Sequence, residues 1–91
     1  MLVQLHEIIV RGNDYGLSVV YVNPRHIISL RENTQMKQSL LENKIKLGLH
    51  HPAEFTEVIL SEGARTKSIT VIGSPSEVQS KFFNIKKLLK G

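Results

Sequence analysis

The chain has 91 residues, no cysteine and a net charge of +4, from 12 basic and 8 acidic side chains. This length predicts one domain, residues 1–91, with little room for a deep active-site cleft, and the missing thiols exclude disulfides and thiolate metal sites. Small secreted domains usually depend on disulfides, and no apolar run approaches the roughly 18 residues of a membrane helix, so we expect a cytoplasmic protein without a membrane span.

The N-terminal part of the sequence predicts two strands. Residues 2–11 mix apolar and polar side chains and end on β-branched residues, which favours a strand. Residues 12–16 predict a turn, because glycine and asparagine tolerate positive φ and Asx side chains bond their own backbone. Residues 17–22 form a dense run of β-formers and predict the second strand.

A proline marks the end of this second strand. Pro24 lacks a backbone donor and biases the residue before it towards an extended conformation, so the strand breaks there. Residues 26–32 then predict a third, short strand. Simple alternation puts Ile28 and Leu30 on one face of this strand and Ile27 on the opposite face.

Residues 33–54 allow two interpretations. Asn33 or Thr34 could cap a helix with a weak apolar stripe that starts at Met36. Gly48 would end this helix. The alternative is a mobile insertion, since a loop of this length without structure of its own is usually functional or disordered. The sequence leaves both interpretations open.

The best hairpin signal follows this segment. Two alternating runs, at residues 56–62 and 67–72, flank a turn that contains glycine. Apolar side chains occupy matching positions in the two runs, so they should share one face of the sheet. These side chains are Val58, Leu60, Ile69 and Val71.

A capped helix is predicted directly after the hairpin. Ser74 can cap the first free amides, Pro75 suits the first helical position, and Glu77 can reach back to the amide of Ser74. The helix should run to about Leu89, with an apolar stripe at spacings of four, three and four residues. The stripe consists of Val78, Phe82, Ile85 and Leu89.

These elements together predict an α+β fold. We expect a small, twisted, mainly antiparallel sheet of about five strands, with the C-terminal helix packed on one face. The apolar side of the hairpin at residues 56–72 should meet the underside of that helix. A sheet of this size has open edges, which proteins protect by charge, by a covering segment or by pairing with another copy. Pairing with another copy would make the protein a homo-oligomer.

Three segments of the sequence form a pattern found in a known family. They are Val22-Asn23-Pro24-Arg25-His26-Ile27-Ile28-Ser29-Leu30, Thr56-Glu57-Val58-Ile59-Leu60-Ser61-Glu62-Gly63 and Ser74-Pro75-Ser76-Glu77-Val78. The pattern resembles the FlbD/SwrD-type proteins, short bacterial proteins associated with flagella and swarming. It consists of an asparagine–proline step before a short strand, a T-x-V/I-x-L-x-x-G hairpin and a capped helix. Similar patterns occur among uncharacterised bacterial and phage proteins.

The resemblance covers most of the chain and carries expectations of its own. It implies the fold described above, a role in flagellar or swarming functions, and no catalytic residues. The sequence departs from the family pattern in two places. It carries the insertion at residues 33–54, and its C-terminal helix is more basic.

Motifs for metal binding and catalysis are weak. His50 and His51 with Glu54 offer imidazole and carboxylate groups, but adjacent histidines on a strand point to opposite sides. Ser61 or Ser68 with a histidine could supply a nucleophile and a base, yet no catalytic motif surrounds either serine. We therefore predict a non-enzymatic protein without catalytic residues, metal or cofactor.

Basic residues are the remaining candidates for binding. Four lysines accompany the apolar stripe of the C-terminal helix, and Phe83 lies among them in angle, so it could stack on a base or fill a partner's pocket. Packing of Phe83 against the insertion, and lysines that complement the helix dipole, are the simpler explanations. Arginines at strand ends or turns can contact phosphates or acidic partners. The candidate residues are Arg25, Arg65, Lys81, Phe83, Lys86, Lys87 and Lys90.

The sequence supports three functional hypotheses. The leading one is a small regulatory or adaptor protein that binds another protein, either as a monomer or as a homo-oligomer. The first alternative is an RNA- or DNA-binding regulatory protein that uses the basic C-terminal helix, and it predicts binding that weakens steeply with salt. The second alternative is a small-ligand or nucleotide binder at a subunit interface.

Overall fold

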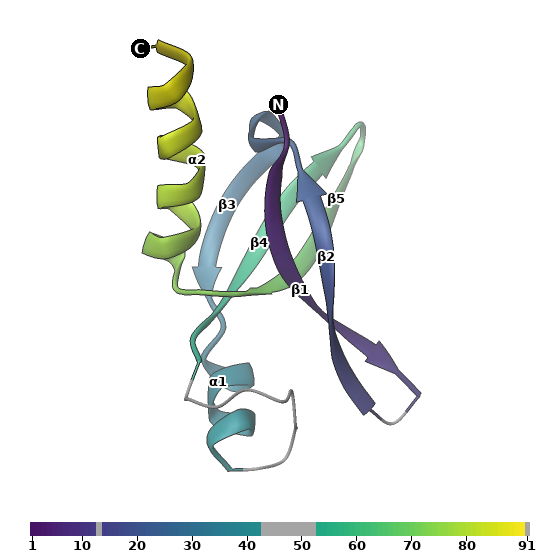
Figure 1. Cartoon of the computed structure of the whole chain (residues 1–91). Coiled ribbons are helices and arrows are strands. Elements are labelled where there is room, and N and C mark those ends of the chain that lie inside the picture. Colours follow the sequence, from purple (N-terminus) through teal and green to yellow (C-terminus); the bar gives the residue numbers. More distant parts are fainter. Residues whose placement is uncertain (13, 43–52, 91) are drawn as a thin grey trace.

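The computed structural model describes residues 1–12, 14–42 and 53–90, with side chains up to Phe82 (Figure 1). The fold is α+β, as the sequence predicts: one open sheet of five antiparallel strands, a C-terminal helix and a second short helix. In chain order the elements are β1 (Val3–Arg11), β2 (Asp14–Val22), η1 (Pro24–His26), β3 (Ile27–Glu32), α1 (Thr34–Leu41), β4 (Phe55–Glu62), β5 (Arg65–Ile72) and α2 (Pro75–Lys90).

The sheet is built from two hairpins that meet along β1 and β5. Its strand order is β2-β1-β5-β4-β3, so β2 and β3 are the two edges. Glu7 of β1 lies opposite Val71 of β5 and joins the hairpins. In Figure 1, α2 stands beside β3, while α1 lies at the opposite end of the sheet, below the start of β4.

The first hairpin turns earlier than the sequence predicts. The second strand was expected at residues 17–22, but β2 begins at Asp14, which pairs with Arg11. Gly12 has a φ of 61°, a left-handed conformation that lets the chain reverse within two residues. The remaining residues of the expected turn therefore extend the strand, and Gly16 lies opposite Ile9.

The predicted contact between the second hairpin and the helix is confirmed. Val58 lies opposite Ile69 in β4 and β5, and both join a buried cluster with Val71 and Val78 of α2. Leu60 and Phe82 pack against the margin of this cluster. Each buried apolar side chain contributes roughly 1.5–3 kcal/mol, so this contact holds α2 on the sheet. Two stripe residues, Ile85 and Leu89, have side chains outside the described part.

The predicted faces of the third strand are wrong. Ile27 and Leu30 both pack against the core, whereas Ile28 is exposed. A register shift between Ile27 and Ser29 causes the difference, because a β-bulge adds a residue and breaks the two-residue alternation. Ile28 instead lines a shallow groove of about 310 Å³ shared with Phe82 of α2.

The segment after β3 begins as a helix, which was one of the two interpretations of residues 33–54. Asn33 caps α1, and its side-chain Oδ1 accepts a hydrogen bond from the Met36 amide at 3.0 Å. The amide of Asn33 also donates to the carbonyl of Phe55 at 2.9 Å, which ties the start of α1 to the start of β4. The expected helix end at Gly48 lies outside the described residues.

The start of α2 follows the predicted cap in part. The Oγ of Ser74 accepts a hydrogen bond from the Glu77 amide at 3.2 Å. The reciprocal bond, in which the Ser74 amide would donate to the Glu77 carboxylate, is absent from the bonds of the described residues. No helix in the described ranges is both long enough and apolar enough to cross a membrane.

Candidate functional site

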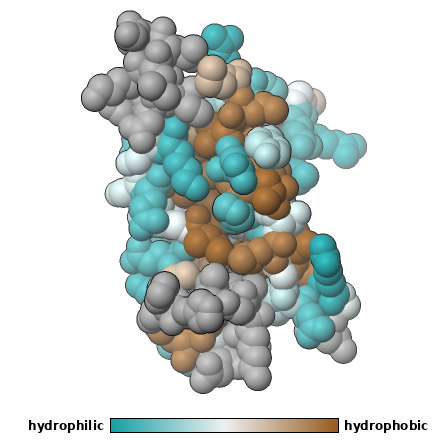
Figure 2. All heavy atoms as spheres, viewed as in Figure 1, coloured by the Kyte–Doolittle hydropathy of each residue, from teal (hydrophilic) through white to brown (hydrophobic). Residues whose placement is uncertain are grey.

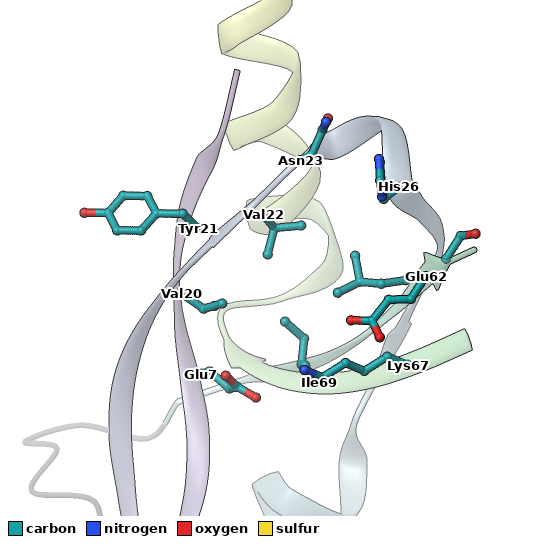
Figure 3. Close-up of a pocket in the computed structure, with 11 residues that line it drawn as sticks. Glu7, Val20, Tyr21, Val22, Asn23, His26, Glu62, Lys67 and Ile69 are labelled. Carbon is teal, nitrogen blue, oxygen red and sulfur yellow. The ribbon is translucent and has the colours of Figure 1, made fainter. Parts of the chain in front are cut away.

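A pocket of about 200 Å³ opens on the face of the sheet that carries the core (Figure 3). It draws on four strands and the turn after β2, so residues distant in the sequence converge there. Its lining residues are Glu7, Val20, Tyr21, Val22, Asn23, His26, Leu60, Ser61, Glu62, Lys67 and Ile69.

The floor of the pocket is an extension of the hydrophobic core. Val22 and Ile69 belong to the buried cluster, and Val20 and Leu60 pack against it. Because side chains alternate along a strand, Val20 and Val22 point into the pocket while the ring of Tyr21 points to the other side of β2 (Figure 3). The floor can therefore pack against an apolar group.

Charged side chains form the rim above this floor. Glu7 comes from β1, Glu62 from the end of β4 and Lys67 from β5, and Figure 3 shows the Lys67 side chain reaching towards Glu7. With His26 neutral, two glutamates and one lysine give the lining a formal charge of −1, on a chain of net charge +4. Within the described ranges, the side chains of Glu7, His26, Glu62 and Lys67 make no hydrogen bond or ion pair.

The pocket brings together one pair of residues that the sequence suggested for catalysis. Ser61 and His26 both line it, but no hydrogen bond joins them in the described part of the chain. No three histidine, aspartate or glutamate side chains of the described residues lie together as metal ligands would. Of the residues considered for a metal site, His50 and His51 lie outside the described residues.

No protein-family model, curated protein or solved structure matches the chain. The resemblance to the FlbD/SwrD-type proteins therefore stays a prediction.

The predicted binding residues are distributed over three parts of the molecule. Arg25 is exposed in η1, one residue before the pocket-lining His26, and Arg65 begins β5 opposite the pocket-lining Glu62, but neither arginine lines the pocket itself. Lys81 is exposed on α2, away from the pocket lining. The other four belong to the last turns of α2, where the side chains are outside the description: Phe83, Lys86, Lys87 and Lys90.

Sequence reasoning missed the rim residues, although the sequence held a signal for them. Glu7 lies two residues after the buried Leu5, and Lys67 lies two residues before the buried Ile69. In an alternating strand such charged residues fall on the core-facing side. A charged side chain at a core-facing position indicates that the layer packed on the sheet ends there. In this protein that position is the mouth of the pocket.

A second exposed feature lies on the opposite face of the β1–β2 hairpin. Exposed apolar side chains gather on these strands, and in Figure 2 hydrophobic surface forms a band over them that hydrophilic side chains interrupt. The four members on this face have exposed fractions between 37% and 66% and are Val10, Tyr15, Val19 and Tyr21.

Proposed function

We propose that the protein is a non-enzymatic regulatory or adaptor protein, and that its pocket takes a lysine or arginine side chain of a partner protein. We further propose a cytoplasmic location, which the lack of cysteine supports. The first proposal rests on the surroundings of the Glu7 side chain. It is half-buried and has no ion pair within the described part of the chain, and it lies above an apolar floor.

The chemistry of the pocket matches a long basic side chain. Lysine and arginine carry an aliphatic stem that packs on apolar surface and a charged head that bonds carboxylates. The stem would lie on Val20 and Val22, and the head would bond Glu7 and Glu62. An apolar centre with a polar rim is also the usual arrangement of a protein–protein interface.

The size of the pocket favours a side chain over a free small molecule. Its volume is about 200 Å³. Sites for drug-sized ligands usually enclose about 300–1,000 Å³ and bury most of the ligand surface. A single side chain, presented by a partner whose remaining contacts lie outside, needs less space.

A peptide selection tests this function. A phage-displayed random peptide library would be selected on the full chain, and the enriched peptides measured by fluorescence polarisation. We expect a shared lysine or arginine next to apolar residues, and at least about tenfold weaker binding to the Glu7→Gln and Glu62→Gln variants. Glu57→Gln is the matched control, because Glu57 lies on the other face of the sheet and should leave binding unchanged.

Two outcomes would overturn this function. One is enriched peptides that bind Glu7→Gln and Glu57→Gln equally well, because the pocket carboxylate would then take no part. The other is failure to enrich any peptide, together with binding of a labelled single-stranded RNA that disappears as salt rises. That result would replace the proposal with the nucleic-acid alternative.

A further inference from the structure

We propose that two copies of this chain pair antiparallel along β2 and so join their sheets into one. This inference goes beyond the proposed pocket function and rests on a different observation, the free edge of the sheet. Of the pocket lining, the dimer would use the outward backbone groups of Tyr21 and not the carboxylates of Glu7 and Glu62.

The two edges of the sheet differ in how they are protected. β3 has six residues, a bulge at its start and the charged pair Arg31 and Glu32 at its end, which all discourage pairing with another strand. β2 has nine residues, and its single charged residue is Asp14, at its first position. It contains neither proline nor bulge. A long edge strand with a charge only at its first position presents a row of unpaired backbone groups.

The hairpin geometry identifies which backbone groups are free. The loop between Arg11 and Asp14 has two residues, so this pair is hydrogen-bonded, and the pattern then alternates along the strand. The even-numbered residues of β2, from Asp14 to Val22, bond to β1. The odd-numbered residues direct their N–H and C=O groups away from the sheet, and they are Tyr15, Leu17, Val19 and Tyr21.

If a two-fold axis passes beside Ser18, all of these outward backbone groups find a partner on the second copy. In that register Leu17 lies opposite Val19 of the second copy, and Tyr15 lies opposite Tyr21 of the second copy. Each of these pairs matches outward-directed groups on both strands, and hydrogen-bonded pairs exchange both N–H···O bonds. A register shifted along the strand would leave outward groups at one end without partners.

The side chains of β2 are complementary in the same register. The four residues with free backbone groups carry the apolar and aromatic side chains of the outer face of β2, and aromatic or β-branched cross-strand pairs stabilise antiparallel sheets. Asp14 lies opposite Val22 of the second copy, at the strand end that leads into Arg25. The one charge of the strand is thus brought towards a basic turn.

Pairing of this kind has a functional consequence. Opposed residues of an antiparallel sheet share a face, so both copies would present their pockets on the same side of the joined sheet. Two equal sites held at a fixed spacing bind a bivalent partner more tightly than one site does. The dimer would therefore act as a two-site adaptor.

Disulfide trapping tests the edge and its register, since the chain has no cysteine of its own. Ser18 would face Ser18 of the second copy as a non-hydrogen-bonded pair, whose Cα atoms lie about 4.5 Å apart, within the range that a disulfide spans. We expect oxidised Ser18→Cys to give a product of twice the 10.3 kDa chain mass on a non-reducing gel. Ser29→Cys, an exposed serine on the other edge strand, should stay monomeric. Equal yields for the two variants would overturn the proposal.

Light scattering on uncrosslinked protein gives the second measurement. Val19→Lys puts a charge on the free edge, and His6→Lys puts the same charge on the same face at the opposed position of the inner strand β1. We expect the dimer dissociation constant to rise at least about tenfold for Val19→Lys and to change less than about threefold for His6→Lys. A monomeric wild-type chain at its highest soluble concentration would overturn the dimer. Peptide binding measured on Val19→Lys would still report on the pocket, so the two proposals can fail separately.

Discussion

Thr56, the second residue of β4, is a polar residue on the core-facing side of that strand. It is fully buried, and its hydroxyl donates a hydrogen bond to the carbonyl of Gly73 at 2.8 Å. Thr56→Val keeps the shape of the side chain but leaves that buried carbonyl without this donor. We expect a loss of roughly 1–3 kcal/mol in the free energy of unfolding, measured by urea denaturation.

An exposed threonine provides the control for this change. Thr66→Val makes the same substitution at an exposed position of β5 and should change the free energy of unfolding by less than about 0.5 kcal/mol. Thr56→Ser keeps the hydroxyl and should lose less stability than Thr56→Val. Equal urea midpoints for the two valine variants, at the same chain concentration, would show that the buried bond contributes nothing.

At the residue scale, the sequence predicted which face a side chain takes in a regular strand and missed the face of a side chain at a β-bulge. Val58 and Ile69 face α2 as expected, because β4 and β5 pair without interruption. Ile28 was assigned to the wrong face because one extra residue in β3 reverses the alternation after it. No residue type near Ile28 marks a bulge, so the period of the pattern alone could not reveal it.

At the scale of elements, Asn33 is the residue that anchors α1. Its side chain caps the helix at the Met36 amide, and its own amide donates to the carbonyl of Phe55. Asn33→Ala removes the cap, and we expect it to lower the free energy of unfolding by about 1 kcal/mol. Urea denaturation, together with circular dichroism for the helical signal, measures the effect.

Lys37 provides the comparison within the same helix. Its ammonium lies 3.4 Å from a carboxylate oxygen of Glu54, but both side chains are more than a third exposed, so solvent screens the pair. Lys37→Ala should cost less than about 0.5 kcal/mol. A larger loss for Lys37→Ala than for Asn33→Ala would mean that the ion pair, and not the cap, ties α1 to β4.

The elements themselves were largely predictable, and their ends were less so. The signals for α2 were local, since Ser74 and Pro75 occupy the positions that a helix start prefers, and the helix begins there. The length of the first turn depended on the conformation of Gly12 and on how far β1 and β2 stay paired. Pairing of this kind is a property of two strands, and neither strand's sequence specifies it alone.

At the scale of the whole molecule, the pocket depends on the order of the strands. Glu7 and Lys67 meet only because β1 lies next to β5, a contact between the two hairpins that their local sequences do not encode. His26 lines the same pocket because η1 follows directly after the edge strand β2, whose last residues also line it. Sequence reasoning could therefore identify charged residues on core-facing positions, but it could not bring them together.

Thermal unfolding offers a whole-molecule check on pairing through β2. If folding and dimer formation are coupled, each tenfold rise in chain concentration stabilises the dimer by about 0.7 kcal/mol per chain. At about 4–8 °C per kcal/mol for a domain of this size, Tm should rise by roughly 3–6 °C per tenfold increase. His6→Lys should show the same rise in Tm as the wild-type chain. Val19→Lys should show a smaller rise over the same concentrations, because its weaker dimer is less populated. A rise equal to that of the wild-type chain would mean that the chains associate through another surface.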